Sequence, residues 1–425
     1  MKILPSLQIF TLCLLISGAG LLFIPSLEPD AFEYPKAMFF ILTTAILSIL
    51  NLIHWGLNNK KISIKKIPIP IKLIGFIFIA ELLAFIFSQD HSISLTGAPY
   101  RLQGFIAELT IIISLLNTTY VFANTRPKKH LIFFTWLIII TIISSVISLL
   151  PYIIEIPFFN IWDFYNRAFG IFGNPNYLAV FLISSIPFFG LILNNKSRLI
   201  KIFSLAGLII TLSSLFLTGC RSAWIALIVS LLITGLIIAI QKKRYKLLLL
   251  AITTIFITIC VFTFQQFQNT PSLSRLSLTK NNLGSLTTRL YLQKSGLQLF
   301  KEHPLIGSGQ DTIAGRIEPY LPEYLKSNYV FYIDRTHNEF LDILIMQGLL
   351  GFIAYITFWI YLFIETIKSS IHSNNLTATL STIAIISIHI YYTGNFTTIS
   401  SNILLYTLAS YLIIANLQAN KETFC

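Results

Sequence analysis

Long apolar segments separated by short polar ones dominate the hydropathy pattern of this 425-residue chain. Twelve of the apolar runs are long enough to cross roughly 30 Å of hydrocarbon as α-helices. The pattern therefore predicts an all-α, polytopic membrane protein with about twelve transmembrane helices. The runs begin near Leu7, Ala37, Ile69, Leu102, His130, Asn174, Leu199, Arg221, Lys246, Asn338, Leu376 and Ser400.

The composition supports the same fold class. Hydrophobic residues make up 55% of the chain and charged residues only 11%, and the mean hydropathy is +0.76. These values lie outside the range of soluble globular domains. A net charge of +13 is compatible with nucleic-acid binding, but the basic residues fall in short clusters between apolar runs rather than on one polar face. We therefore expect them to set membrane topology, and we expect no nucleic-acid partner.

The polar connections alternate in charge. Lysines and arginines cluster in every second connection, whereas the connections between them carry acidic residues. By the positive-inside rule, the basic connections and both termini are cytoplasmic, so every even-numbered helix begins on the outer face. The basic clusters are Lys60-Lys61 with Lys65-Lys66, Arg126 with Lys128-Lys129, Lys196 with Arg198 and Lys201, and Lys242-Lys243-Arg244 with Lys246.

One connection, residues 266–336, is far longer than the others, and the same rule places it outside. Leucines at 286, 290 and 297, followed by Phe300, have helical spacing, and Pro304 is expected to end the helix. We expect an amphipathic helix on the membrane surface within a small helical cap that has a working role. The predicted organisation is residues 1–265 with nine membrane helices, 266–336 as the large outer loop, and 337–425 with three more helices.

Two of the outer helix starts carry distinctive polar residues. Gly173-Asn174-Pro175-Asn176 opens the sixth run, with Asn174 suited to the N-cap and Pro175 to the first helical position. Thr218-Gly-Cys-Arg-Ser222 is so short a turn that the helices on either side are expected to be antiparallel neighbours. It places Arg221 at the start of the eighth run.

A third outer helix start lies between Arg335 and Asp342. Thr336 followed by Glu339 fits a capping box, which puts His337 and Asn338 in the first turn of the helix. A helix N-terminus presents free N–H groups and the positive end of the dipole. If the three helix starts meet, they and Arg221 form an electropositive pocket suited to an anionic, phosphate-bearing substrate.

Each feature also has a simpler interpretation. Asn-Pro-Asn is an ordinary helix start, and Arg221 at a membrane edge can reach lipid phosphates. An interfacial histidine such as His337 is typical of a headgroup contact, and Arg289 on a surface helix is typical of a solvated charge. Glu81 and Glu108, in or near apolar runs, are compatible with relay groups of a transporter, although Glu108 also lies close to the outer end. The combination of polar helix starts favours a site.

The sequence gives no indication of a metal or another cofactor. It contains no Asp-x-Asp or His-x-x-x-His pattern, and its four cysteines form no CxxC pair. No glycine-rich nucleotide loop follows a strand pattern, so an ATP-driven mechanism has no support. We therefore expect no metal and no cofactor.

A set of loose motifs follows in fixed order from Arg167 to Gly351, and two weaker ones extend it toward both ends of the chain. The motifs are Arg167-x-x-Gly170 leading to Gly173-Asn-Pro-Asn-Tyr-Leu-Ala179, Thr218-Gly-Cys-Arg-Ser-Ala-Trp224, Thr288-Arg289 with Pro304-Leu-Ile-Gly-Ser-Gly309, His337-Asn-Glu-Phe-Leu-Asp342 before Gly348-Leu-Leu-Gly351, and the weaker Tyr100-Arg101-x-x-Gly104 and Gly394-Asn-Phe396. This set resembles the O-antigen ligase / O-antigen polymerase (Wzy-C type) superfamily, and is most similar to the ligases. Cys220 departs from the small or hydroxyl residue usual in that family.

The resemblance implies a helical fold of the lipid-phosphosugar glycosyltransferase (GT-C) type. It implies metal-independent, inverting transfer of a glycan from an undecaprenyl-pyrophosphate carrier on the periplasmic face of the bacterial inner membrane. Arg221 and Arg289 would bind the donor pyrophosphate and His337 would lie at the reaction centre. Arg101, Arg167 and Asn338, within the motifs, are further candidates for substrate binding.

The resemblance leaves the acceptor open between three hydroxyl compounds. Lipid A-core is the acceptor of a ligase, which we favour. A second lipid-linked repeat would make the protein a polymerase, and a protein hydroxyl would make it an O-oligosaccharyltransferase.

The chemistry is consistent with the residues on physical grounds. Pyrophosphate is a good leaving group, so arginines and helix N-termini can neutralise its charge without a metal. A neutral imidazole can take the proton of the acceptor hydroxyl, although His337 as a phosphate binder stays open. A transporter of small anions is the alternative from another class. It would show broken helices and buried charges near the midplane, whereas the polar residues here collect at the outer helix ends.

Overall fold

The computed structural model describes residues 3–25, 30–58, 67–99, 101–154, 167–193, 197–242, 280–328, 333–372 and 375–420. Over these ranges the chain forms helices and connecting turns, with no β-strand.

Nine helical segments in the described ranges are long and apolar enough to cross a membrane. Two further predicted runs form shorter apolar helices within α11 (Arg221–Lys242) and α17 (Leu376–Tyr392). The run predicted near Lys246 lies outside the described residues. The chain is an all-α, polytopic membrane protein, as the hydropathy pattern predicts. The nine segments contain α1 (Leu4–Leu21), α2 (Glu33–Asn58), α3 (Ile69–Ile86), α5 (Phe105–Asn124), α6 (Pro127–Leu149), α8 with α9 (Pro175–Ser185 and Phe189–Leu193), α10 (Arg198–Leu217), α16 (Glu339–His372) and α18 (Ile399–Ala419).

Helix α18 forms the centre of the bundle, because it packs against α5, α17, α16, α8 and α1. It is buried around nearly its whole circumference, as expected of a helix enclosed by other helices. Its serines bond to neighbouring backbones instead of to water: the Ser400 hydroxyl donates to the Ala19 carbonyl at 2.7 Å and the Ser410 hydroxyl to the Leu115 carbonyl at 3.0 Å.

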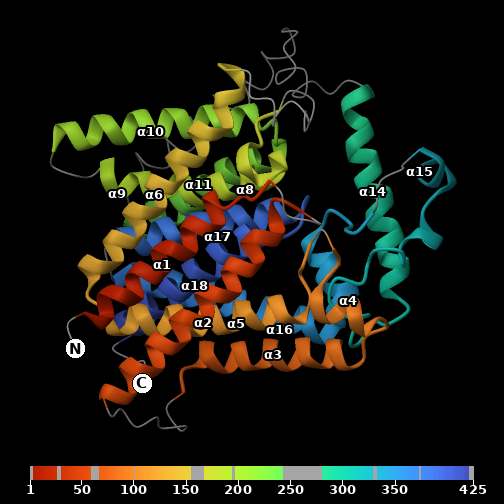
Figure 1. The fold of residues 1–425 in the computed structure, drawn as a ribbon, viewed down its shortest axis with the longest axis horizontal. Coiled ribbons are helices and arrows are strands. Elements are labelled where there is room, and N and C mark those ends of the chain that lie inside the picture. The colour runs from red at the N-terminus through yellow and green to blue at the C-terminus, as the bar shows by residue number, and fades with distance from the viewer. Residues whose placement is uncertain are drawn as a thin grey trace.

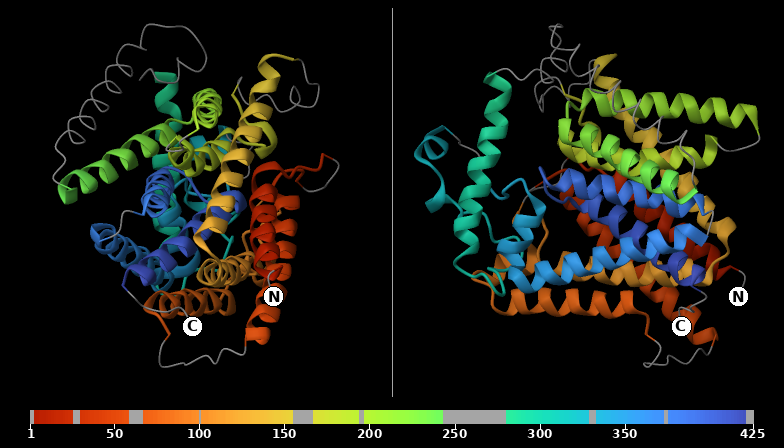
Figure 2. Two further views of the ribbon diagram at one scale, coloured as in Figure 1. Left: turned by 90° about the vertical axis from the view of Figure 1, so that its left-hand side faces the viewer. Right: turned by 180° about the vertical axis from the view of Figure 1, so that it is seen from behind.

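Most of the long helices run side by side, and α14 (Lys280–Phe300) crosses one end of the bundle (Figure 1). The view from behind shows that the chain termini lie at the other end (Figure 2). The helix predicted within the long connection is thus present, and it ends before Pro304.

The turn at residues 218–220 joins α10 and α11, but these two helices do not pack against each other along their length. Helix α10 packs mainly on α6 and α9, whereas α11 packs mainly on α17 and α8. The expectation of antiparallel neighbours is therefore wrong. A short turn fixes where two helices meet, but packing surfaces further along decide how far they diverge.

The even-numbered predicted helices all begin at the end that α14 crosses. The Ile399 N–H at the start of α18 donates to the carboxylate of Glu33 at the start of α2 at 3.2 Å. The Tyr391 hydroxyl donates to the Asn176 carbonyl at the start of α8 at 3.0 Å. These contacts confirm that the even-numbered helices begin at the same end of the bundle. That this end faces the outer side of the membrane stays a prediction from the charge pattern.

The chain between α14 and α16 forms a small cap with a core of its own. It includes the short 3-10 helix Glu318–Tyr320 and the helix α15 (Glu323–Asn328). Its buried side chains pack between α14 and the first turns of α16. The cap contributes Ile313, Ile317, Leu321 and Leu325, α14 contributes Leu292 and Leu299, and α16 contributes Leu341, Ile345 and Met346.

Helix α16 is broken at Gly348, whose φ of +66° lies in the left-handed region. The cap segment from Pro304 to Gly309 crosses α16 at this break: the Leu349 N–H donates to the Pro304 carbonyl at 2.8 Å and the Ser308 N–H to the Ile345 carbonyl at 2.9 Å. A Cβ on Gly348 would lie 2.4 Å from the Leu305 carbonyl carbon. The segment Pro304–Gly309 and the glycine motif at Gly348 therefore pack against each other. We expected a broken helix only in a transporter, but here the backbone of the cap packs into the break.

Candidate active site

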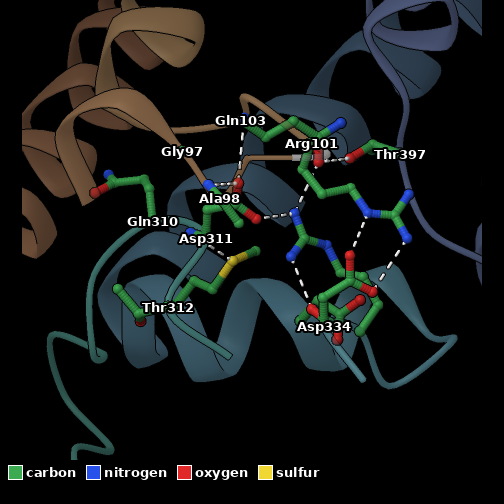
Figure 3. Close-up of polar contacts among 12 residues, drawn as sticks. Gly97, Ala98, Arg101, Gln103, Gln310, Asp311, Thr312, Asp334 and Thr397 are labelled. Carbon is green, nitrogen blue, oxygen red and sulfur yellow. Dashed lines mark hydrogen bonds and ion pairs between the residues drawn. The ribbon is translucent and has the colours of Figure 1, made fainter. Parts of the chain in front are cut away.

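Arg101 is held in place between an acid and an aromatic ring at the shared end of the bundle. Its Nε lies 2.6 Å and one Nη 3.1 Å from the two carboxylate oxygens of Asp334, a bidentate pair (Figure 3). Its other Nη donates to the Tyr177 hydroxyl. The guanidinium carbon lies 4.1 Å from the centre of the Phe396 ring. Arg101 lowers the pKa of the Asp334 carboxyl below its usual range, against the opposing effect of burial.

Arg335 forms a second, buried ion pair that ties the cap to the helix starts. The side chain is 2% exposed, and one Nη lies 2.5 Å from a carboxylate oxygen of Asp311 and 2.8 Å from the Gln103 Oε1. The Asp311 carboxylate also accepts the Ala98 N–H at 2.6 Å. Burial alone would lower the pKa of Arg335, but Asp311 and Asp334 raise it above its ordinary value. Arg335 therefore stays charged although it is out of water.

His337 lies just before α16 with a backbone φ of +58°, which is uncommon for a non-glycine residue. Its ring packs 5.1 Å from that of Phe396. Burial, then the positive charges of Arg289 and Arg101, lower the pKa of His337 to about 3, against the opposing charge of Asp334. Its Nδ1 is buried and has no hydrogen-bond partner in the part of the chain that the structure describes. The imidazole is thus neutral at physiological pH.

The predicted capping box is wrong. Helix α16 begins at Glu339, and the Asn338 Oδ1 caps it by accepting the N–H groups of Phe340 at 3.1 Å and Leu341 at 3.3 Å. The Thr336 hydroxyl instead donates to Asp342 at 2.6 Å. The carboxylate of Glu339 accepts the N–H of Thr397 at 2.8 Å, so it is not free to close a box.

This different cap changes the interpretation of two predicted site residues. Asn338 uses its side-chain oxygen on the helix, so its position has a structural explanation. His337 lies outside the helix, where the left-handed backbone turns its ring toward Phe396.

Arg289 reaches from α14 to the turn between α17 and α18. One Nη donates to the Gly394 carbonyl at 2.8 Å, and the other lies 3.5 Å from the Asn395 Oδ1. Asn395 in turn donates to the Ser222 hydroxyl at 2.6 Å and accepts the Glu339 N–H at 3.0 Å. The starts of α11 and α16 and the middle of α14 therefore meet at one residue. Arg221, the first residue of α11, directly precedes Ser222.

Arg167 joins two other helix starts. Its Nε donates to the Thr218 carbonyl at 2.5 Å and an Nη to the Asn176 side chain at 3.1 Å. Asn174 accepts the Asn176 N–H at 2.8 Å as the N-cap of α8, with a proline at the first helical position, as predicted. Arg167 thus fixes the turn that carries Arg221, which is a positioning role.

The structure brings three of the six predicted site residues close together. Arg101 and His337 both pack on the Phe396 ring. The charges of Arg289 and Asp334 act on His337. We call Arg101, Arg289, His337, Phe396 and Asp334 the mouth site. Arg167 and Arg221 lie on neighbouring helix starts, and Asn338 caps α16. Sequence reasoning missed the residues that hold the arginines. They are Tyr177, Asp311, Asp334, Arg335 and Phe396.

The mouth site combines a neutral base with fixed positive charge. Two arginines and the N-terminal ends of several helices suit an oxyanion with several acceptor oxygens, such as a phosphate or pyrophosphate. A neutral imidazole beside that anion can accept a proton from a nucleophile.

Part of the chain is similar to a known family of proteins. Residues 205–356 match the model of the family described as O-antigen ligase, a segment that contains Arg221, Arg289 and His337. A curated relative, an uncharacterized protein of Haemophilus influenzae, is 28% identical over 204 residues, which cover 45% of this chain and 50% of that protein. The chain thus spans about half the length of this relative. Residues 205–356, with the ordered motifs around them, are therefore similar to the O-antigen ligase family.

Proposed function

We propose that the protein is a glycosyltransferase that moves a glycan from an undecaprenyl-pyrophosphate carrier to a hydroxyl of lipid A-core on the periplasmic face of the inner membrane. The observation that carries this proposal is the neutral imidazole of His337 between Arg101 and Arg289, in the segment that matches the O-antigen ligase family. The charge pattern supports a periplasmic site, since the positive-inside rule assigns the basic connections to the cytoplasm and the starts of the even-numbered helices to the outer face.

The arginines act on the leaving group. In the proposed reaction the acceptor oxygen bonds to the anomeric carbon, and the bond from that carbon to the phosphate oxygen breaks with inversion. The pyrophosphate leaves with the electron pair, and its charge develops beside Arg289 and Arg101. Fixed guanidinium groups in a partly buried site need little reorganisation to stabilise that charge, so the residues present can perform this step without a metal.

His337 acts on the acceptor. The arginines and burial make its imidazole a weak base in the free protein, with a pKa of about 3. Bound pyrophosphate would offset the arginine charges and make the imidazole more basic. Proton removal is thereby coupled to donor binding.

The test is transfer by the purified protein in lipid nanodiscs. An undecaprenyl-pyrophosphate glycan is offered separately with lipid A-core, with a second lipid-linked repeat and with a pilin-like protein. We expect product with lipid A-core. Extension of the repeat would instead identify a polymerase, and modification of the pilin a protein glycosyltransferase. Anion uptake by proteoliposomes without transfer to any acceptor would contradict the proposal as a whole.

A further inference from the structure

A polar cavity of about 30 Å³ lies between α3, α5, α16 and α18. Three carboxyl groups line it, one from each of three helices: Glu81 on α3, Glu108 on α5 and Glu339 on α16. Arg335 and Gln103 complete the wall toward the mouth site. This cluster is separate from the residues that would contact the donor.

The charges around the cavity do not balance if all three carboxyls are ionised. Arg335 is the cation on its wall, and that side chain is already paired with Asp311. Three carboxylates within membrane-spanning helices, without cations to match them, would cost several kcal/mol each. The cavity must therefore hold additional positive charge, either as protons or as a bound cation.

Buried polar atoms without partners show what fits the space. Glu81 Oε2, Gln103 Nε2 and Arg335 Nε have no hydrogen-bond partner among the residues described, and their side chains are 4%, 5% and 2% exposed. One acceptor and two donors suit water, which can satisfy both kinds of group, and the volume is enough for one or two water molecules.

The geometry favours protons over a chelated metal ion. No three His, Cys, Asp or Glu side chains in the described ranges converge as metal ligands do. Carboxyls that face one another across water, but do not meet at a point, can share protons instead.

The cavity and the mouth site share a wall. Gln103 Oε1 accepts from Arg335 at 2.8 Å and from the Thr397 hydroxyl at 3.4 Å, and both of these residues line the cavity. Glu339 follows His337 by two residues and accepts the Thr397 N–H. A proton leaving His337 therefore has only a few side chains between it and the carboxyls.

We propose that this cavity is a proton-binding site that receives the proton released by the acceptor hydroxyl during transfer. The inference rests on the proposed function and deepens it. His337 takes the proton as the new oxygen–carbon bond forms and the pyrophosphate leaves with its electron pair. The imidazolium then passes the proton, through water, to the carboxylate of Glu339 or Glu108, which becomes a neutral carboxyl. Release of that proton to solvent restores the cavity.

Several titratable groups face the cluster and take part in its charge state. Glu108 interacts with Glu81, Glu339, Asp311 and Arg335. Further groups come from the same helices and from α17 and α18. They are Asp342, Tyr355, Tyr392 and Tyr406. Because the carboxyls share protons, low pH should protonate all of them and leave no carboxylate to accept a further proton.

The first test is the pH dependence of kcat/KM for the donor in Glu108→Gln and Glu339→Gln. This quantity reports groups of the free protein, in which His337 has a pKa of about 3 and does not titrate between pH 5 and 8. We expect the wild-type kcat/KM to fall at low pH. In each variant kcat/KM should be about tenfold to a hundredfold lower at neutral pH, and the fall at low pH should shift or disappear. Small carboxylic-acid buffers should restore part of the rate.

Glu365→Gln is the matched control, because Glu365 lies on α16 but pairs with Lys368 and Asn420 away from the cavity. Its pH profile should follow that of the wild type. Thermal unfolding and donor binding measured for all three variants separate a folding defect from a lost proton acceptor. If the Glu339→Gln and Glu108→Gln profiles both superimposed on the wild-type profile, the proposal would be overturned.

The second test needs no donor. Infrared spectroscopy of the protein in H₂O and D₂O should show a protonated-carboxyl band that titrates with pH and loses intensity in both glutamine variants. Absence of that band from the wild type would overturn the proton site. If the band is present and the wild type transfers no glycan, the proton site stands and the glycosyltransferase proposal fails.

Discussion

The two ends of the helix bundle hold their helices together with different chemistry. At the end of α2 far from the mouth site, neutral amides form a chain: Gln8 donates to Asn51 at 2.8 Å, and Asn51 donates to the Asn117 Oδ1 at 2.9 Å. At the mouth site, buried arginines and carboxylates perform the equivalent task. Amides are enough to join helices within a membrane, so the costlier charges at the other end indicate a role beyond packing.

The largest effect expected at the mouth site comes from His337→Ala. Removal of the general base should lower the transfer rate by roughly 10²-fold to 10⁴-fold. Donor binding should change little, because the arginines remain. The measurement is single-turnover transfer in nanodiscs, with donor affinity determined separately. Near-normal transfer by this variant would show that the imidazole is not the base.

Asp311→Ala should have the largest effect on stability. It leaves Arg335 buried without its carboxylate partner, which costs about 3–5 kcal/mol. The loss should first release the cap, because Asp311 connects the cap to Ala98 and Arg335. Limited proteolysis between α14 and α16, together with thermal unfolding, measures the effect. Unchanged protection of the cap would contradict this role for the pair.

Gly348→Ala should destabilise the crossing of the cap and α16 by about 1–3 kcal/mol, because it forces a side chain into a left-handed conformation. The added Cβ would also meet the Leu305 backbone. Gly75→Ala on α3 is the matched control, since a Cβ there meets nothing within 4 Å. Thermal unfolding should show a lower midpoint for the first variant only.

Sequence reasoning succeeded where one physical effect dominates. Hydropathy gave the helices because a membrane leaves few other ways to satisfy the backbone, and charge alternation gave the shared end of the even-numbered helices. The cap of α8 was predictable because Asn174 and Pro175 act on their own helix. It failed at Thr336 and Glu339, whose partners are Asp342 and Thr397; the second of these is far away in sequence.

The residues that position the mouth-site side chains could not be predicted either, because their partners are distant in the sequence. In the sequence, Asp311 and Asp334 look like ordinary loop charges. Asp311 pairs with Arg335 and Asp334 pairs with Arg101, and both partners are distant in the chain. Gln103 and Glu108 line one cavity because α3, α5, α16 and α18 pack together around it. Such contacts follow from tertiary packing, and a periodic pattern in one segment carries no signal for them.

The electrostatics of the mouth site can be measured at His337 directly. Arg289→Gln removes a positive charge that lowers the pKa of His337, so the pKa should rise above about 3. Asp334→Asn removes a negative charge that raises it, so the pKa should fall further. Nuclear magnetic resonance of histidine-labelled protein gives both values. A pyrophosphate analogue should raise the pKa in the wild type, and a fall on binding would contradict the proposed coupling.

The smallest effect should come from Asn51→Ala at the opposite end. The variant removes one bond from Gln8 and two to Asn117, and interhelical hydrogen bonds of this kind contribute about 0.6 kcal/mol each within membranes. Thermal stability should therefore fall slightly, while the transfer rate and its pH profile match those of the wild type. This result would show that the amide chain contributes to packing alone, in contrast to the mouth site. If Asn51→Ala slowed transfer as much as a mouth-site variant does, charge would no longer distinguish the two ends, and the argument for function at one end would fail.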